Sequence, residues 1–213
     1  MRPDLIVLHY TAMANARAAE DRLCDPSAEV SAHYLIAGDG AVTQLVAEEA
    51  RAWHAGAGRW GAVADVNSRS IGIELDNRGT HPFAAPQMDA LEALLAGIMA
   101  RWLIPPQRVI GHSDMAPGRK VDPGPRFDWA RLARQGLAIA TPRIFAENSG
   151  DTAQLSADLH RLGYTAECDD ATRLAAFRLR HRPHHHGPPD GIDAALAREL
   201  AARFPVDGRP ASA

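Results

Sequence analysis

The chain has 213 residues and a formal net charge of −3, with 46% hydrophobic and 23% charged residues. Single domains most often run to about 100 to 150 residues, so we expect one main domain and a small appendage. The composition excludes extensive disorder, and the near-balanced charge gives no electrostatic reason to expect a nucleic-acid partner. No apolar run reaches the roughly 18 to 20 residues of a membrane span, so we expect no integral membrane segment.

The chain enters the apolar run LIVLHY almost at once, without the small-residue cleavage site that ends a signal peptide. As written, the sequence therefore predicts a cytoplasmic protein, or a periplasmic or outer-membrane-associated one if an N-terminal segment is missing. Cys24 and Cys168 lack the spacing of a metal-binding pair and fit two free thiols better than a disulfide framework.

Short β-rich runs alternate with helical stretches in the first half, which predicts an α/β domain with a mixed central β-sheet flanked by helices. Gly-Asp-Gly tolerates the positive φ of a tight turn, so we predict a β-hairpin between Leu35 and Leu45. Apolar residues recur every three or four positions from Ala85 to Leu103, which predicts an amphipathic helix that ends before Pro105. The predicted strands are 5–10, 32–36, 42–45, 70–75 and 108–111.

Turn-forming residues without periodicity follow a short helix after Trp129, which indicates a linker. Beyond it we predict three short helices, with Asp170 and Asp193 as N-caps and Gly163 as a C-terminal stop. A unit of about fifty residues is near the lower limit for independent folding, so it should pack on the first unit or form a minimal bundle. The predicted organisation is a main domain at 1–140, a linker at 141–150, a three-helix domain at 151–205 with helices at 152–162, 170–180 and 193–204, and a tail at 206–213.

Three polar residues, His9, Glu74 and His112, stand at the ends of apolar runs. Ligands and catalytic groups gather where strands end, because the loops there aim side chains into a shared crevice. Side chains alternate along a strand, so Glu74 shares a face with Gly72, whose missing side chain leaves space beside the carboxylate. Glu74 is therefore predicted to face a cleft.

His112 opens a segment in which Lys120 and Asp122 lie two residues apart, in a stretch that prolines keep extended, so both side chains point the same way. Two histidines and one carboxylate form a set of zinc ligands, and a set of three leaves the fourth position open for water, as in catalytic sites. Glu74 and Lys120 would then supply a base and a cation against the oxyanion. From spacing alone, separate hydrogen-bonded or solvated side chains remain an open alternative, because sequence distance does not prove convergence.

Five motifs follow one another along the chain: IVLHYTA, VSAHYLIAGDG, AWHAGAGRW, NSRSIGIELDNRG and VIGHSDMAPGRKVDPGPRFDW. In their order and approximate spacing, over about residues 5 to 135, they resemble the motifs of the AmpD-like family of zinc-dependent N-acetylmuramoyl-L-alanine amidases. The resemblance implies a mixed sheet flanked by helices, with the metal in a surface groove. It also implies His9, His112 and Asp122 as zinc ligands, Glu74 as the catalytic glutamate and Lys120 as the lysine that stabilises the transition state.

The resemblance further implies Zn2+ as cofactor and hydrolysis of the amide between N-acetylmuramic acid and L-alanine of the stem peptide, in cell-wall degradation or recycling. Peptidoglycan or muropeptide fragments would be the partners, and the 1,6-anhydro form of the sugar stays open. His33, Tyr34, His54 and Asn67 fall in or beside motifs that line the family's groove and are predicted to bind substrate. Trp53 fits the core and a platform for a sugar ring equally well.

The C-terminal unit is similar to the three-helix peptidoglycan-binding module often joined to such amidases, with a Leu-Gly-Tyr turn at 162–164 and a helix around Phe177. The competing hypothesis is a recognition protein that binds peptidoglycan without cutting it, and loss of a metal ligand would mark such a protein. All three ligands are present here, so we predict an enzyme. The cluster His184, His185 and His186 is expected to lie in a solvated loop and receives no function.

Overall fold

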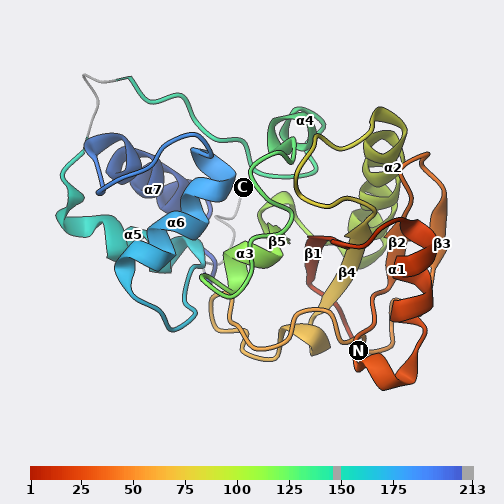
Figure 1. The fold of residues 1–213 in the computed structure, drawn as a ribbon. Helices are drawn as coiled ribbons and strands as arrows, with labels where there is room; N and C mark the ends of the chain where they lie inside the picture. Colours follow the sequence, from red (N-terminus) through yellow and green to blue (C-terminus); the bar gives the residue numbers. More distant parts are fainter. Residues whose placement is uncertain (146–149, 208–213) are drawn as a thin grey trace.

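A computed structural model describes residues 1–145 and 150–207 (Figure 1). A five-stranded sheet in the order β3-β2-β4-β1-β5 organises the first part of the chain, and three helices follow it. The strands are β1 Leu5–Tyr10, β2 Tyr34–Ile36, β3 Val42–Gln44, β4 Ser70–Leu75 and β5 Val109–Gly111. The helices are α1 Ala16–Leu23, α2 Ala85–Trp102, α3 His112–Met115, α4 Trp129–Arg134, α5 Leu155–Leu162, α6 Asp170–His181 and α7 Gly191–Arg203.

The sheet is mixed, as predicted: β1 pairs in parallel with β4 and β5, β2 pairs in parallel with β4, and β3 closes the predicted antiparallel hairpin with β2. The predicted strand at 32–36 begins only at Tyr34, because the amides of Leu45 and Val46 both donate to the His33 carbonyl and interrupt the regular ladder. Because four of the five strands are parallel, the carboxyl ends of β1, β4 and β5 meet at one edge of the sheet.

Alternation along the strands separates two hydrophobic clusters, one on each face of the sheet. Ile6 and Leu8 of β1 pack in one cluster with α2 and α4, whereas Leu5 and Val7 pack in the other. The predicted helix at 85–103 is confirmed as α2, which ends where Leu103 adopts a left-handed conformation. Among the residues that the structure describes, no helix has the length and apolar character needed to cross a bilayer.

The N-caps of the C-terminal helices differ from the prediction. Asp169, not Asp170, caps α6: it is extended and accepts a hydrogen bond from the Thr172 amide at 2.7 Å. Asp190 caps α7, while Asp193 lies at the third helical position and accepts from the Asp190 amide at 3.0 Å, completing a capping box. Each error has the same cause: two carboxylates stand close together, and only backbone conformation decides which one is the cap.

Helix α1 is missing from the sequence-based prediction. It begins after Asn15, whose side-chain oxygen accepts a hydrogen bond from the Ala18 amide at 2.9 Å. An Asn followed by an alanine-rich stretch is a recognisable start signal.

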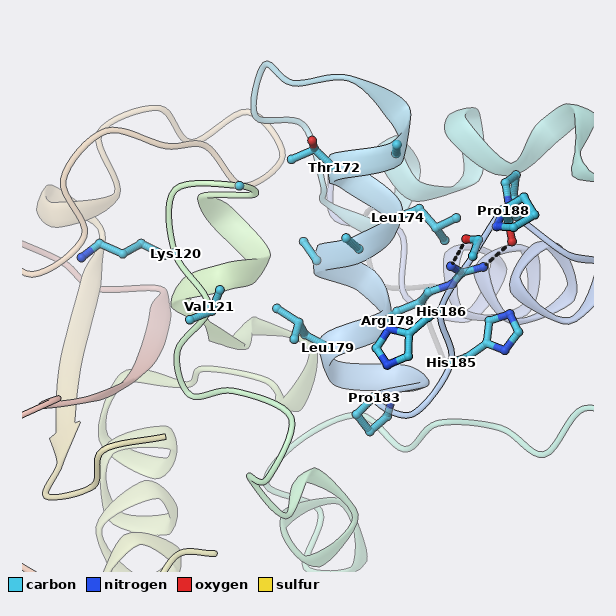
Figure 2. A pocket seen from close by; sticks show the side chains of 16 residues that line it. Lys120, Val121, Thr172, Leu174, Arg178, Leu179, Pro183, His185, His186 and Pro188 are labelled. Atoms are coloured by element: carbon cyan, nitrogen blue, oxygen red, sulfur yellow. Dashed lines mark hydrogen bonds between the residues drawn. The ribbon is translucent and has the colours of Figure 1, made fainter. Parts of the chain in front are cut away.

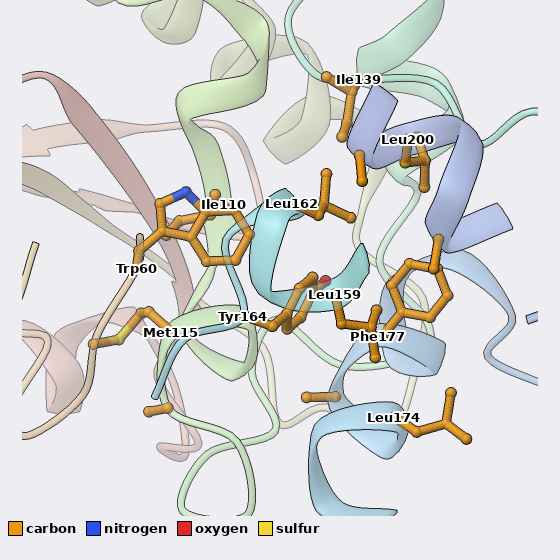
Figure 3. Close-up of a cluster of buried hydrophobic side chains, with 14 of the residues drawn as sticks. Trp60, Ile110, Met115, Ile139, Leu159, Leu162, Tyr164, Leu174, Phe177 and Leu200 are labelled. Atoms are coloured by element: carbon orange, nitrogen blue, oxygen red, sulfur yellow. The ribbon is translucent and has the colours of Figure 1, made fainter. Parts of the chain in front are cut away.

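The three C-terminal helices pack directly on the first unit, beside α3 and β5 (Figure 1). One hydrophobic cluster joins Trp60, Ile110 and Met115 of the first unit to Tyr164 and Phe177 of the second (Figure 3). Gly163 ends α5 as predicted, with a φ of 136°, and a Cβ at this position would lie 2.4 Å from the Trp60 ring. The two units therefore share one core.

A buried polar network reinforces this contact. Asp114 on α3 is fully buried and accepts hydrogen bonds from the Tyr164 hydroxyl at 2.7 Å and from Arg180 at 3.1 Å. It also accepts from the Gly111 amide at 2.8 Å, which fixes the first turn of α3. The second unit therefore supports the segment that carries His112.

Replacing Glu48 by Gln is expected to lower the free energy of unfolding at neutral pH by about 1 to 2 kcal/mol. Burial raises the pKa of Glu48, but hydrogen bonds from Arg101, Tyr34 and Trp102 outweigh it and lower the pKa to about 2. A lowered carboxyl pKa stabilises the fold above the ordinary value of 4.5, and this contribution fades as the pH falls toward 2. Urea denaturation of both proteins at pH 7 and pH 3 should therefore show a smaller difference at pH 3; an unchanged difference would contradict this assignment.

Candidate active site at the carboxyl edge of the sheet

The edge where the parallel strands end carries three of the predicted site residues. His9 lies near the end of β1, Glu74 holds the paired position on β4, and His112 directly follows β5. His9 belongs to the same face of β1 as Leu5 and Val7, the face that packs toward the C-terminal helices. Topology and alternation together thus bring these side chains to one place.

His9, His112 and Asp122 converge on one point. His9 Nδ1 lies 2.9 Å from His112 Nδ1 and 2.9 Å from Asp122 Oδ2, and His112 Nδ1 lies 3.0 Å from Asp122 Oδ2. All three residues are buried, and their donor atoms form a possible metal-binding group. The Ser113 amide donates to the Asp122 carbonyl at 2.9 Å, so the loop that carries Asp122 is tied to α3.

The protonation of these three groups fits a cation between them. His112 Nε2 lies 2.8 Å from the Ala55 carbonyl and must donate to it, which leaves Nδ1 with a free lone pair in the neutral ring. Burial and the nearby His112 lower the pKa of His9 to about 4, so its ring is neutral at pH 7. The two lone pairs and the Asp122 carboxylate oxygen would face one point, and two imidazoles with one carboxylate suit zinc.

Glu74 is a buried carboxyl group with a raised pKa. Burial, followed by the charge of Asp122, raises its pKa to about 8, whereas Lys120 acts in the opposite direction. Within the described part of the chain, its Oε2 atom is buried and has no hydrogen-bond partner. A carboxyl group with a pKa near neutrality is suited to general acid–base work.

A cavity of about 440 Å³ opens over these groups and includes His9, Glu74, His112, Lys120 and Asp122 in its lining. Its wall also contains Trp53, 51% exposed, and Val121, 53% exposed, together with Arg22 and Arg119. This exposure favours a role of Trp53 as a platform for a sugar ring over a place in the hydrophobic core. The five residues predicted to carry the chemistry thus line one pocket.

The structure does not bring all the predicted substrate-binding residues to this cavity. His33 is fully buried, accepts from the Gly72 amide through Nδ1 and contacts the Ala50 carbonyl through Nε2. Tyr34 points to the opposite face of the sheet, where its hydroxyl donates to Glu48 at 2.7 Å. Both side chains are therefore committed to internal contacts.

His54 and Asn67 lie beneath the metal-binding group rather than out in the groove. His54 touches the cavity, and its Nδ1 lies 3.0 Å from His9 Nε2. Asn67 is buried, and its side-chain oxygen accepts from the amides of His54 and Ala55 at 3.0 and 2.9 Å. The space beside Gly72, expected next to Glu74, is filled by the His54 ring: a Cβ at Gly72 would lie 2.3 Å from it.

Sequence reasoning missed several groups around the site. Arg119 donates to the carbonyls of Ala55 and Ala57 and lines the cavity. Its position directly before Lys120, itself a predicted site residue, could have marked Arg119 as part of the site. The Ala55 carbonyl carried no signal of its own, because its partner His112 is distant in sequence.

A second cavity, of about 510 Å³, lies between the loop that carries Lys120 and Val121 and helix α6 (Figure 2). Thr172, Leu174 and Leu179 of α6 line its other side. Lys120 and Val121 border both cavities, so the two cavities adjoin at this loop.

His185 and His186 of the histidine cluster line this second cavity, whereas His184 is exposed outside its lining. His185, Asp190 and Asp193 also form a possible metal-binding group, with His185 Nε2 3.1 Å from Asp190 Oδ2. Both carboxylates are already paired with arginines: Arg182 contacts each of them, and Arg178 contacts Asp193. Guanidinium groups hold the charge that a metal would need, so this group is structural.

The comparisons with known proteins agree with the geometry. Residues 1–125 match the family model described as N-acetylmuramoyl-L-alanine amidase. The N-acetylmuramoyl-L-alanine amidase AmiD of Escherichia coli strain K12 is 36% identical over 97% of this chain and 85% of its own length. The structure of AmiD from E. coli in complex with the substrate anhydro-N-acetylmuramic acid-L-Ala-D-gamma-Glu-L-Lys has a TM-score of 0.86 and 34% identity, covering 96% of this chain and 90% of that one.

AmpDh3 of Pseudomonas aeruginosa in complex with anhydromuramic pentapeptide gives the same TM-score of 0.86, with 31% identity over 97% of this chain and 94% of that one. Both structural matches include the C-terminal helices, since they cover nearly the whole chain. The five-stranded mixed sheet and its flanking helices match the fold of these amidases. The chain belongs to the N-acetylmuramoyl-L-alanine amidase family and is an enzyme of that class.

Proposed function

We propose that this chain is a zinc-dependent amidase that cleaves the bond between N-acetylmuramic acid, including its 1,6-anhydro form, and L-alanine of the peptidoglycan stem peptide. The observation that carries the proposal is the convergence of His9 Nδ1, His112 Nδ1 and Asp122 Oδ2 within 3.0 Å, beside Glu74 in the same cavity. The anhydro form is included because the matched structures of AmiD and AmpDh3 hold anhydromuramic ligands.

His9, His112 and Asp122 would hold the metal ion. When bound, zinc supplies Lewis acidity and lowers the pKa of water to about 7. Glu74 would accept the proton of the attacking water and pass it to the leaving amine of L-alanine, because burial raises its pKa toward neutrality. The water oxygen adds to the lactyl carbonyl carbon, the C–N bond breaks, and a carboxylate and a free amine result.

Lys120 would stabilise the oxyanion that develops on the carbonyl during this addition. Its side chain lines the same cavity as Glu74, and a fixed positive charge beside a developing negative one lowers the barrier. Arg22 and Arg119 add positive charge to the cavity wall, which suits the carboxylates of a stem peptide. The half-exposed Trp53 offers a flat apolar face for the sugar.

The second cavity offers room for longer fragments of the cell wall. This cavity begins at Lys120 and Val121 and runs along α6. A wall fragment whose scissile bond lies in the first cavity can therefore extend toward the C-terminal helices. A protein that only recognises peptidoglycan needs neither the three converging ligands nor a carboxyl group with a pKa of about 8. The enzyme is therefore the better reading of this site.

Replacing His112 by Ala is expected to remove both bound zinc and turnover, because the loss of one of three ligands leaves the other two unable to retain the ion. Zinc content by elemental analysis and stem-peptide release from a muropeptide check the two effects together. Thr141→Val changes an exposed residue outside the lining of the cavity. This control variant should fold and keep both bound zinc and turnover. Full zinc occupancy in the His112 variant would contradict the ligand assignment.

A further inference from the structure

We propose that Ser70 and His54 are positioning residues that fix the tautomer of His9, so that its Nδ1 atom presents a lone pair to the metal. The inference deepens the proposed function and rests on the metal site described there. It assigns His54, which the family resemblance placed among the substrate-binding residues, to the support of the metal ligand His9 instead.

The hydrogen bonds run from the Val66 carbonyl through Ser70 and His54 to His9, and the carbonyl fixes the direction of each one. The Ser70 hydroxyl lies 2.6 Å from the Val66 carbonyl, which can only accept, so the single hydroxyl proton is donated there. Ser70 Oγ also lies 3.2 Å from His54 Nε2 and must therefore accept from it. His54 is thus protonated on Nε2, and its Nδ1 atom carries a lone pair.

The same logic carries over to the ligand. His54 Nδ1 lies 3.0 Å from His9 Nε2, and because His54 Nδ1 is an acceptor, His9 Nε2 must donate. The neutral His9 ring then has no proton on Nδ1, the atom that faces His112 and Asp122. A carbonyl four residues before Ser70 therefore determines, through two side chains, which nitrogen of His9 is free to bind a metal.

The surroundings hold His54 in the position that this relay needs. Gly72 leaves room for the ring, since a Cβ there would lie 2.3 Å from His54 Cγ. Asn67 accepts from the amides of His54 and Ala55 with one oxygen. Ala55 in turn accepts from His112 Nε2 through its carbonyl, so a single anchored loop supports both histidine ligands. Groups that orient ligands in this way typically change metal affinity about 10- to 100-fold when removed.

The tautomers of the unmodified full chain provide the first test. Two-bond 1H–15N correlation spectra of the 15N-labelled, zinc-loaded protein distinguish protonated from unprotonated imidazole nitrogens. The proposal predicts that both His54 and His9 carry their proton on Nε2. A proton on Nδ1 of His54 would overturn it, whatever the activity of the protein.

Zinc affinity provides the second test, measured by competition with a chromophoric chelator. Ser70→Ala and His54→Leu are expected to bind zinc about 10- to 100-fold more weakly than the parent chain. His54→Asn should recover part of the loss, because its amide oxygen can accept from His9 Nε2 near the place of the missing Nδ1. A merely structural role for His54 would show no such rescue.

Thr141→Val is the matched control, because Thr141 Oγ1 contacts the buried His181 at 2.8 Å in a hydroxyl–imidazole pair away from the metal. It should bind zinc as tightly as the parent chain. If Ser70→Ala also binds zinc with parental affinity, the relay is wrong while the metal site stands. If the parent chain itself binds no zinc, the proposed function fails instead. Should His54→Leu not fold, Ser70→Ala and the tautomers of the parent chain still decide.

Discussion

Glu74→Gln is expected to lower kcat about 10²- to 10⁴-fold while zinc affinity stays within about twofold of the parent chain. The amide cannot accept the proton of water, yet it matches the carboxyl group in size and lies on β4 outside the ligand triad. The burial that raises the pKa of Glu74 to about 8 also means that a neutral amide costs little stability there. Steady-state kinetics on a purified muropeptide, with zinc content measured on the same sample, separates the two effects.

Glu49→Gln is the matched control, since Glu49 is exposed and lies outside the lining of the cavity. It should retain parental kcat and zinc affinity. A Glu74→Gln variant with more than about a tenth of parental kcat would exclude Glu74 as the proton carrier. A variant that also loses zinc would place Glu74 among the groups that hold the metal.

Removal of the C-terminal helices is expected to abolish folding of the remaining chain rather than only weaken its action on the cell wall. A chain that stops at Phe145 loses Tyr164, Phe177 and other core partners of Trp60 and Met115. Each lost large apolar contact costs about 2 to 5 kcal/mol, and several together exceed the total stability of about 5 to 15 kcal/mol of a typical domain. Asp114 would also be left buried without Tyr164 and Arg180.

Circular dichroism and thermal melting of the shortened chain measure this effect directly. We expect an aggregated or unfolded product without a cooperative transition. An independently folded wall-binding module would give another result: a shortened chain that melts cooperatively near the parental temperature and loses action on polymeric wall more than on soluble fragments. That result would contradict the shared core as a source of stability.

Much of the site's outline was predictable because it depends on local rules. His9, Glu74 and His112 stand at strand ends, and period-two alternation decides which face each occupies. Parallel pairing then brings the three ends together, and the structure confirms this sheet. These rules need only the pattern of apolar runs.

The roles of the remaining histidines were not predictable from such rules. His33 and His54 both follow an apolar or aromatic residue in a family motif. His33 is nevertheless buried in the core, whereas His54 contacts His9, a proposed metal ligand. Gly72 meets the two rings differently. Its amide donates to His33 Nδ1, whereas the absence of a side chain at Gly72 leaves room for the His54 ring. Packing between distant segments, such as the contact of Asp114 with Tyr164 50 positions later, leaves no periodic signal either.

The most direct test of the central claim is the release of free stem peptide from a purified muropeptide, followed by mass spectrometry, before and after removal of zinc by a chelator. The account predicts release of a peptide that begins with L-alanine, its loss on chelation and its return when zinc is added back. Unchanged release by a chain shown to be free of zinc would contradict the proposed metal site. Binding of the muropeptide without any release, in the zinc-loaded chain, would contradict the proposed amidase.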